Sequence, residues 1–292
     1  MSLPDELKPI VEIEETGPDR FSGRTPDWPG SRVFGGFVVA QALVAATKSV
    51  SPLGEAAVDR PSELLPLLRP HSLHGYFLSP VLPGTEVTFE VEPLRDSRSF
   101  ALRQVTTIQD GVTRARFLCS FHIDEKGEAE YQLKPPTRLE DPDRYQRAGA
   151  FAHLDLRIAE PVAGDDGTFV SSGRHWVRVA SPLPDDWALH AGVLAFLSDQ
   201  TRLSFRPYSE EAFGTHTDAS LDHAVWFHRP ARADRWLRYE LQALSVHGNR
   251  STVRGLMFDQ QGALVMSMAQ ELLVRPIPGA EPQVPPWRQQ PE

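Results

Sequence analysis

The sequence predicts an α+β protein made of two tandem repeats, each a long apolar helix wrapped by an antiparallel sheet. Three observations predict this. The two halves of the chain match at a constant offset of 150 residues, each half has one stretch with apolar residues at helical spacing, and each half continues into strands joined by a tight turn. The 292 residues are enough for two units of roughly 130 residues with a substantial core.

The repeat is clearest in a strand–proline–strand segment. At the offset of 150, matching positions hold Phe77 and Phe227, Pro80 and Pro230, Phe89 and Tyr239, Glu90 and Glu240, and Leu94 and Leu244. The same offset relates residues 34–50 to 184–200, and an offset one residue longer relates 99–123 to 250–274. An offset that holds to within one residue across a helix, a strand pair and a hairpin indicates an internal repeat rather than chance.

This pattern divides the chain into four segments. The sequence predicts an N-terminal repeat over 1–130, a polar linker over 131–150, a C-terminal repeat over 151–276 and a disordered tail rich in Pro and Gln over 277–292. We expect the C-terminal repeat to carry the candidate site residues described below.

Each repeat begins with a helix that is too apolar for a surface position. In the first repeat Val38, Val39, Ala42, Leu43 and Ala46 recur at helical spacing after a pair of glycines. The second repeat has a similar stretch, PDDWALHAGVLAFLSDQ. A helix that is apolar on most of its faces needs other structure around it, so we expect the sheet of each repeat to enclose its helix.

Alternating strands follow each helix. In the first repeat they are expected at 85–92, 102–108 and 112–123, with a turn at Asp110-Gly111, and in the second at 236–244, 251–258 and 263–274. One buried helix followed by a long antiparallel meander is the hotdog arrangement. Two copies in tandem would join their sheets edge to edge and so protect an edge of each. The segment 51–70 is interpreted as an insertion or a second short helix.

Composition excludes several classes of function. The formal charge of −9, from 30 basic and 39 acidic residues, argues against a nucleic-acid surface. A single cysteine, Cys119, excludes an internal disulfide framework, and with no His/Cys cluster at metal spacing we expect no metal and no cofactor. We also expect no signal peptide, no membrane span and a cytoplasmic location, because no apolar run approaches about 20 residues.

The candidate site residues are polar residues that interrupt apolar elements. Asp199 ends the second apolar helix, Gln270 interrupts the last strand, and Ser220 lies beside Asp222 and His223 where a strand begins. Their positions at the ends of one helix and two strands suggest that they meet at one mouth of the C-terminal repeat. Each residue alone is more often a cap, a solvated side chain or part of a turn, so the residues by themselves leave the site open. Cys119, in the apolar strand FLCSF, is interpreted as a core residue.

Several runs resemble one family in order along the chain. RVFGGFVVAQALVAA and HSLHGYFLSP, and then WVRVASPLPDDWALHAGVLAFLSD, LDHAVWFHRP and DQQGALVMSMAQELLVR, resemble the type II acyl-CoA thioesterases of the bacterial TesB kind and their peroxisomal relatives. The resemblance covers roughly residues 15–275. It implies a double-hotdog enzyme that hydrolyses fatty acyl-CoA to free fatty acid and CoA.

The resemblance also implies roles for the three candidate residues. An Asp, a Ser or Thr and a Gln of the C-terminal repeat hold and activate the attacking water in that family, and here these positions are Asp199, Ser220 and Gln270. Asp199 would be the general base, and Ser220 and Gln270 would hold the water. Ser220 stands where bacterial members usually carry Thr, and Phe37 and Ala40 replace a polar residue and a glycine, a change that could narrow the substrate groove.

Other assignments stay open at this stage. The donor that stabilises the oxyanion is sought at Gly35 and Gly36 or in the stretch before Ala191. His74 and His223, expected at strand starts, are interpreted as structural residues, with donation to the substrate carbonyl as the alternative. The cations that flank the site motifs, and so are candidates for binding the CoA phosphates, are Arg229, Arg250 and Arg254.

Two other functions compete with hydrolysis. A hotdog enoyl-CoA hydratase usually has an Asp and a His a few residues apart, and no His closely follows Asp199. A non-catalytic acyl-CoA-binding protein would need none of the three polar residues. The partners we expect are the acyl-CoA substrate and a second copy of the chain, as a homodimer or higher homo-oligomer.

Overall fold

The computed structural model describes residues 5–50, 68–135, 140–148, 153–159, 162–163, 169–170, 173–200 and 214–282. Residues 51–67 of the segment expected to be an insertion or a second short helix (51–70), and the end of the expected tail (283–292), lie outside the described residues. Residues 68–70 of the first segment belong to neither and instead begin a strand. Within the described ranges, no helix has both the length and the apolarity needed to cross a membrane.

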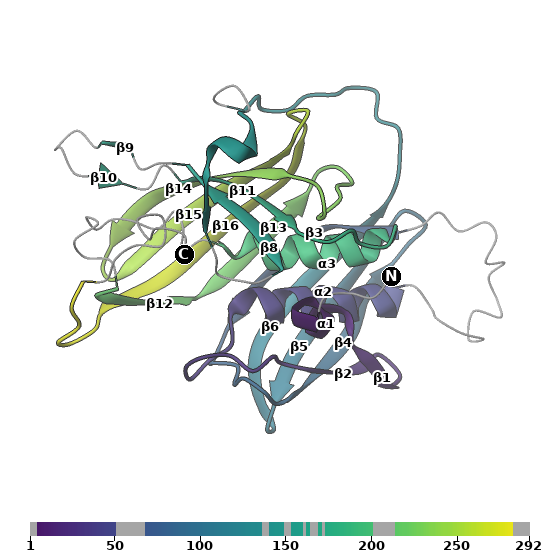
Figure 1. Cartoon of the computed structure of the whole chain (residues 1–292). Helices are drawn as coiled ribbons and strands as arrows, with labels where there is room; N and C mark the ends of the chain where they lie inside the picture. Colours follow the sequence, from purple (N-terminus) through teal and green to yellow (C-terminus); the bar gives the residue numbers. More distant parts are fainter. Residues whose placement is uncertain are drawn as a thin grey trace.

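The predicted double-hotdog α+β fold is confirmed. Among the described residues one antiparallel sheet has 14 strands, in the order β1-β2-β4-β5-β6-β3-β13-β16-β15-β14-β11-β8-β7, with β12 also paired to β16 (Figure 1). The strands up to the sheet centre are β1 (Glu14–Gly17), β2 (Arg20–Arg24), β3 (Leu68–Phe77), β4 (Glu86–Asp96), β5 (Phe100–Gln109) and β6 (Val112–Ile123). The later strands of this sheet are β7 (Gln146–Ala148), β8 (Leu154–Ile158), β11 (Arg174–Val179), β12 (His216–Ser220), β13 (Asp222–Phe227), β14 (Leu237–His247), β15 (Arg250–Asp259) and β16 (Leu264–Pro276). A separate short pair consists of β9 (Val162–Ala163) and β10 (Phe169–Val170).

The two halves of the sheet meet at β3 and β13 with mirrored strand orders. From the centre outwards one half runs β3-β6-β5-β4-β2 and the other runs β13-β16-β15-β14-β11. In the antiparallel register of β3 and β13, His74 lies opposite Ala224, which is its own counterpart at the offset of 150. A pseudo-twofold axis therefore passes through this residue pair. The two sheets are joined edge to edge through β3 and β13, as predicted.

Two apolar helices fill the space that the curled sheet encloses. They are α2 (Gly35–Val50) and α3 (Trp187–Ser198), and they pack against each other, with the short α1 (Lys8–Val11) beside α2 (Figure 1). Every residue of α3 from Leu189 to Ser198 is buried, which explains why its sequence has no polar face. Phe37 of α2 and Phe196 of α3 contact each other with ring centroids 4.7 Å apart, so the core is continuous across the two halves.

The turn after β5 is the tight hairpin that the sequence predicts. Asp110 and Gly111 both have positive φ angles, 52° and 73°, which is the geometry that favours an Asp-Gly pair between two strands. The matching turn after β15 is wider. There the Asp259 carboxylate accepts hydrogen bonds from the backbone N–H groups of Gln261 and Ala263.

Some features differ from the sequence-based expectation. Six strands that were not predicted, β1, β2, β7, β8, β11 and β12, extend the sheet; each has at most six residues. A short strand gives too few alternations to stand out in a sequence. His74 lies inside β3, not at a strand start, and Gly35 and Gly36 form the first turn of α2 instead of preceding it.

Candidate active site

Three of the sequence-predicted site residues meet around the side chain of Gln270. Its Nε2 donates one hydrogen bond to Asp199 Oδ1 and one to Ser220 Oγ, each 2.7 Å long. Asp199 and Gln270 are almost completely buried, with exposed fractions of 3% and 1%. These residues come from a helix end and two strands, as their places in the sequence suggested.

The end of α3 positions the carboxylate. Asp199 is the residue at which the helix stops, with φ −84° and ψ 7°, and its backbone N–H still donates to the carbonyl of Leu197. The side chain therefore leaves the helix axis at a fixed place. Because the preceding turns are buried on all sides, this place is set by the core and not by a mobile loop.

A break between two strands positions Ser220. β12 and β13 both pair with β16, and between the pairs Ser220–Leu272 and Ala224–Ala269 the three residues 221–223 face only two, Gln270 and Glu271. The ladder is held across the break by Asp222, whose carboxylate accepts a hydrogen bond of 2.6 Å from the backbone N–H of Glu271. Burial raises the pKa of Asp222, although this bond acts in the opposite direction. The irregular backbone turns the Ser220 hydroxyl toward Gln270.

The hydrogen-bond directions fix what each group can still do. A carboxamide has two N–H hydrogens, and those of Gln270 go to Asp199 and Ser220. Because the Ser220 oxygen accepts, its own O–H is directed elsewhere and can donate. The other oxygen of Asp199, Oδ2, faces the start of α2: a Cβ atom placed on Gly35 would lie 2.8 Å from it.

A cavity of about 350 Å³ opens onto Asp199 and Ser220. Its apolar described lining comes mainly from the N-terminal half and includes Trp28, Val33, Phe34, Val38, Phe77 and Val81. Arg32 lies at this cavity and donates to the backbone carbonyl of Asp218. Apolar walls with a few convergent polar groups are typical of a pocket that binds a small molecule, and both halves of the chain build it.

A buried histidine lies behind the carboxylate. His223 Nε2 is 2.7 Å from the Ser198 hydroxyl, and this hydroxyl donates to the carbonyl of Ala195. Ser198 therefore accepts from His223, which assigns the proton to Nε2 and leaves Nδ1 as an acceptor, 4.0 Å from Asp199 Oδ1. Burial lowers the pKa of His223 to about 4, with the Gln270 side chain opposing the shift, so the ring is neutral near pH 7.

The carbonyl of Ser198 is held as well. The Tyr239 hydroxyl donates to it over 2.7 Å. Burial, together with the nearby Asp199 carboxylate, raises the pKa of Tyr239, which keeps the phenol protonated as a donor. The last helical residue before Asp199 is thus fixed through both its side chain and its backbone.

The other residues singled out in the sequence lie elsewhere. Cys119 is fully buried and burial raises the pKa of its thiol, as expected of a core residue. His74 stacks edge-on against Trp226, with ring centroids 4.8 Å apart. Arg229 lines a different cavity, while Arg250 pairs with Glu271 and Arg254 with Gln242, and none of these three arginines is among the described residues that line the pocket.

Sequence reasoning missed the cation that does line the pocket. Arg32 precedes α2 by three residues, and no spacing in the sequence separates it from other arginines. Ser198 was overlooked because it precedes the more conspicuous Asp199. Its signal was present: a polar residue within a helix that is otherwise buried and apolar.

Comparison with known proteins gives a consistent result. Residues 24–122 match the family model "Acyl-CoA thioesterase N-terminal domain", and residues 153–273 match the model "Acyl-CoA thioesterase". The chain is 30% identical to acyl-coenzyme A thioesterase 8 of Rattus norvegicus, over 92% of this chain and 88% of that protein. It is 29% identical to acyl-CoA thioesterase 2 of Haemophilus influenzae, over 91% of this chain and 96% of that one. The crystal structure of acyl-CoA thioesterase II TesB2 from Mycobacterium marinum superposes with a TM-score of 0.77 at 32% identity, covering 94% of this chain and 100% of the other.

Proposed function

The chain belongs to the type II acyl-CoA thioesterase family and is an acyl-CoA thioester hydrolase, and from this premise we propose that it cleaves fatty acyl-CoA with a water molecule activated by Asp199. The observation that carries the proposal is the pair of hydrogen bonds from Gln270 to Asp199 and Ser220 at the end of a largely apolar pocket. A thioester carbonyl is electrophilic, so its hydrolysis needs an oriented water and a base.

The proposed reaction uses the Asp199 carboxylate as the base and the Ser220 hydroxyl as the group that orients the water. Asp199 Oδ2 accepts a proton from the water while the water oxygen bonds to the thioester carbon, and the Ser220 hydroxyl holds the water in line. The tetrahedral intermediate then collapses with cleavage of the C–S bond. The CoA thiolate leaves, taking up the proton that Asp199 had accepted, and the products are the free acid and CoA.

The start of α2 is the better of the two candidates for the oxyanion donor. Gly35 lies next to the Asp199 carboxylate and lines the pocket, which supports the first turn of α2 as the source of the backbone N–H donor. At the start of α3, the alternative, the Asp186 side chain already accepts from the N–H groups of Ala188 and Leu189.

The decisive experiment replaces the base and leaves its shape unchanged. We expect Asp199→Asn to lower the rate of CoA release from acyl-CoA by about 10²–10⁴-fold, the range for loss of a general base, while a non-hydrolysable thioether analogue still binds. The same chemical change at an exposed hairpin position, Asp110→Asn, is the matched control and should leave turnover unchanged.

Two results would contradict the proposal in different ways. If Asp199→Asn retained full turnover, another group would be the base. If the wild-type protein bound short, medium and long acyl-CoA without releasing CoA from any of them, the chain would be a binding protein that has kept the fold.

We also propose that the repeats span 1–130 and 151–276, and that the protein acts in the cytoplasm as a homodimer or higher homo-oligomer. The mirrored strand orders support the division into repeats. Tyr76, Leu118 and Trp226, exposed by 62%, 42% and 37% on the central strands, support a contact with a second copy. Size-exclusion chromatography with light scattering tests the assembly, and cell fractionation tests the location.

A further inference from the structure

The pseudo-twofold axis gives the molecule a second cavity that corresponds to the catalytic pocket. Residues 77–81 line the catalytic pocket, and their counterparts at the offset of 150, residues 227–231, line the second cavity. Residues 218–221 of the pocket likewise correspond to 68–71, of which 69–71 line the second cavity. This cavity has a volume of about 500 Å³ and lies at the start of α3, whereas the catalytic pocket lies at its end.

Among the described residues that line it, the second cavity has none of the catalytic groups. The counterparts of Asp199, Ser220 and Gln270 are Ser49, Pro70 and Cys119. Cys119 is assigned by the strand register, because it pairs with residue 73 in β3 as Gln270 faces residue 223, the counterpart of 73, in β13. Ser49 is engaged elsewhere, since its hydroxyl donates to Asp19 and accepts from Arg103. No water can be activated in this cavity by the chemistry proposed above, so any function it has is binding.

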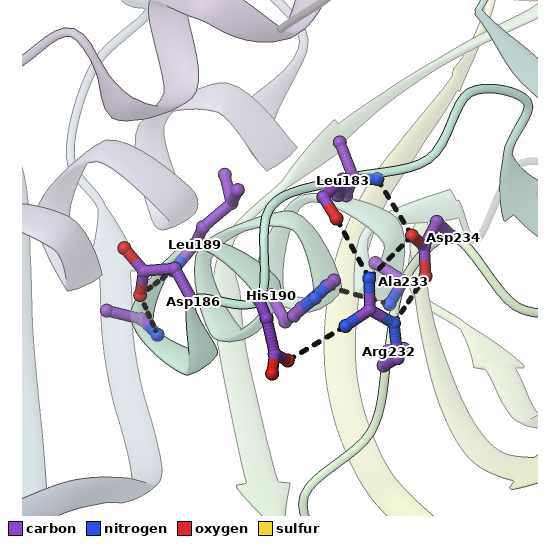
Figure 2. A network of polar contacts seen from close by, with 9 residues as sticks. Leu183, Asp186, Leu189, His190, Arg232, Ala233 and Asp234 are labelled. Atoms are coloured by element: carbon purple, nitrogen blue, oxygen red, sulfur yellow. Dashed lines mark hydrogen bonds and ion pairs between the residues drawn. The ribbon is translucent and has the colours of Figure 1, made fainter. Parts of the chain in front are cut away.

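A buried donor without a partner lies in this cavity. His190, exposed by only 4%, lines it, and its Nδ1 accepts a hydrogen bond of 3.1 Å from the backbone N–H of Ala233 (Figure 2). Burial lowers the pKa of His190, so near neutral pH the ring carries a single proton, which must lie on Nε2. This Nε2 is buried with no hydrogen-bond partner among the described residues. An unpaired buried donor is unfavourable unless an acceptor from a ligand or water reaches it.

The rest of the lining is amphipathic. Trp187, Leu194 and Phe227 supply apolar surface, and Arg69 and Arg229 supply positive charge. The lining also includes the carboxylates of Asp124, Glu125 and Asp185. The acidic partners of these cations are exposed: Arg69 is 3.5 Å from Asp124 and Arg229 is 3.2 Å from Glu130, and the two acidic side chains are 74% and 84% exposed. Arg229 also donates to the Leu264 carbonyl over 2.9 Å, a contact that orients its guanidinium without neutralising its charge. Exposed ion pairs of this kind contribute little, so a ligand carboxylate can replace the acidic partner. Arg232 is different, because its partner Asp234 is only 5% exposed and the Leu183 carbonyl also accepts a hydrogen bond from it (Figure 2).

From these groups we propose that the second cavity is a non-catalytic binding site for an apolar chain that ends in a carboxylate, that is, a fatty-acid anion. The chain packs against the apolar lining, and the carboxylate pairs with Arg69 and Arg229 and accepts from His190. The cavity volume is within the roughly 300–1,000 Å³ of small-molecule pockets. His190 and Asp199 are nine residues apart on α3, about 14 Å along its axis, so both cavities can be occupied at once.

The test uses decanoate as the probe, with isothermal titration of the whole chain. Arg69→Gln and, separately, Arg229→Gln should each weaken one class of decanoate sites about tenfold, because each removes a charge-assisted contact. Arg32→Gln, the same change in the catalytic pocket, should leave that class unaffected. Decanol, with the same chain and no charge, should bind this cavity at least tenfold more weakly than decanoate.

Hydrolysis of acyl-CoA serves as the fold control, since neither Arg69 nor Arg229 lines the catalytic pocket and both variants should retain turnover. Unchanged decanoate binding in both variants would overturn the proposal, as would equal affinity for decanol and decanoate. Binding of CoA without an acyl chain to this class of sites would overturn it too, because the ligand would then be a phosphate. None of these results depends on Asp199, so failure here is distinguishable from failure of the proposed hydrolysis.

Discussion

The contact between Gly35 and Asp199 joins the two halves of the chain at the scale of single atoms. A Cβ at residue 35 would lie 2.8 Å from Asp199 Oδ2 and 3.2 Å from the ring of Phe77. Both distances are shorter than ordinary van der Waals contact, and the carboxylate is held on its other oxygen by Gln270. Glycine is therefore required here for close approach and not for backbone freedom.

We expect Gly35→Ala to lower kcat by at least tenfold with little loss of stability, because the methyl group displaces the carboxylate oxygen that faces the pocket. The measurement is steady-state CoA release together with thermal unfolding. Gly192→Ala is the matched control, a glycine-to-alanine change in the other buried helix. There the new Cβ meets only methyl groups, Val44 Cγ2 at 3.1 Å and Ile10 Cγ2 at 3.6 Å. Equal losses of activity in both variants would contradict this account.

At this scale the sequence could predict residue types but not contacts. Asp199, Ser220 and Gln270 were identifiable because each is a polar residue in an apolar element, and the structure brings them together. The proximity of Gly35 was not predictable, since it depends on how α2 docks beside α3. Arg229, Arg250 and Arg254 were chosen because they lie near the site motifs in the sequence. On β15 the side chains alternate between the two faces of the sheet, and Arg250 and Arg254 contact Glu271 and Gln242 instead of the pocket.

At the scale of elements, the two ends of α3 have different roles: the first is capped and stabilises the helix, and the second positions a site residue. At its start the Asp186 carboxylate accepts hydrogen bonds from the N–H groups of Ala188 and Leu189 (Figure 2). At its end Asp199 lies at the pocket. The cap fixes the position of the first turn. Because the following turns are buried and rigidly packed, the position of the last residue is fixed as well.

Asp186→Ala should reduce the free energy of unfolding by about 0.5–2 kcal/mol, the usual contribution of an N-cap carboxylate. For a chain of this size that corresponds to a fall in Tm of roughly 2–4 °C per kcal/mol, measurable by calorimetry. Asp185→Ala is the neighbouring control. Its side chain is 97% exposed and pairs with Arg232, which keeps Asp234, so a change within about 0.5 kcal/mol is expected. Similar destabilisation in both variants would mean that charge, and not capping, is responsible.

The predictability of most elements followed their length. The exception is β3, which has ten residues but whose start was not predicted, because its burial pattern does not alternate regularly. The bounds of β6 were predicted without error and those of β4, β5, β14, β15 and β16 to within a few residues, because ten or more alternating residues give a clear period. β12 was missed, since its five residues HTDAS are mostly polar and it is a strand only because β16 extends past β13 to pair with it. The strand therefore forms because of a tertiary contact, and the local sequence contains no signal for it.

At the scale of the whole molecule, buried neutral histidines make stability depend on pH. Burial lowers the pKa of His175 to about 3 and that of His223 to about 4, below the value of roughly 6.5 for an unfolded chain. Between these values the unfolded chain binds protons that the folded chain does not. Stability is therefore full above about pH 6.5 and decreases as the pH falls, by up to about 1.4 kcal/mol per pH unit for each histidine.

We expect Tm to fall between pH 7.5 and pH 5, and His175→Phe to make this fall shallower, because it removes one of the groups that take up a proton on unfolding. His175 packs against the ring of Tyr239 with centroids 5.2 Å apart and its Nε2 has no described partner, so an apolar ring is compatible with the site. The exposed His247→Phe is the control and should leave the slope of Tm against pH unchanged. A slope unaltered by His175→Phe would contradict the assignment.

The pseudo-twofold axis through His74 and Ala224 has a genetic consequence. A dimer of two identical single-repeat chains would have the same residue at both of its symmetry-related cavities, and any mutation would alter both at once. When the two repeats are fused in one chain, the residues that line the two cavities are encoded by separate codons. One copy can then lose its acid, hydroxyl and amide and acquire arginines and histidines, while selection on the other copy preserves the chemistry and, through the shared sheet, the fold of both.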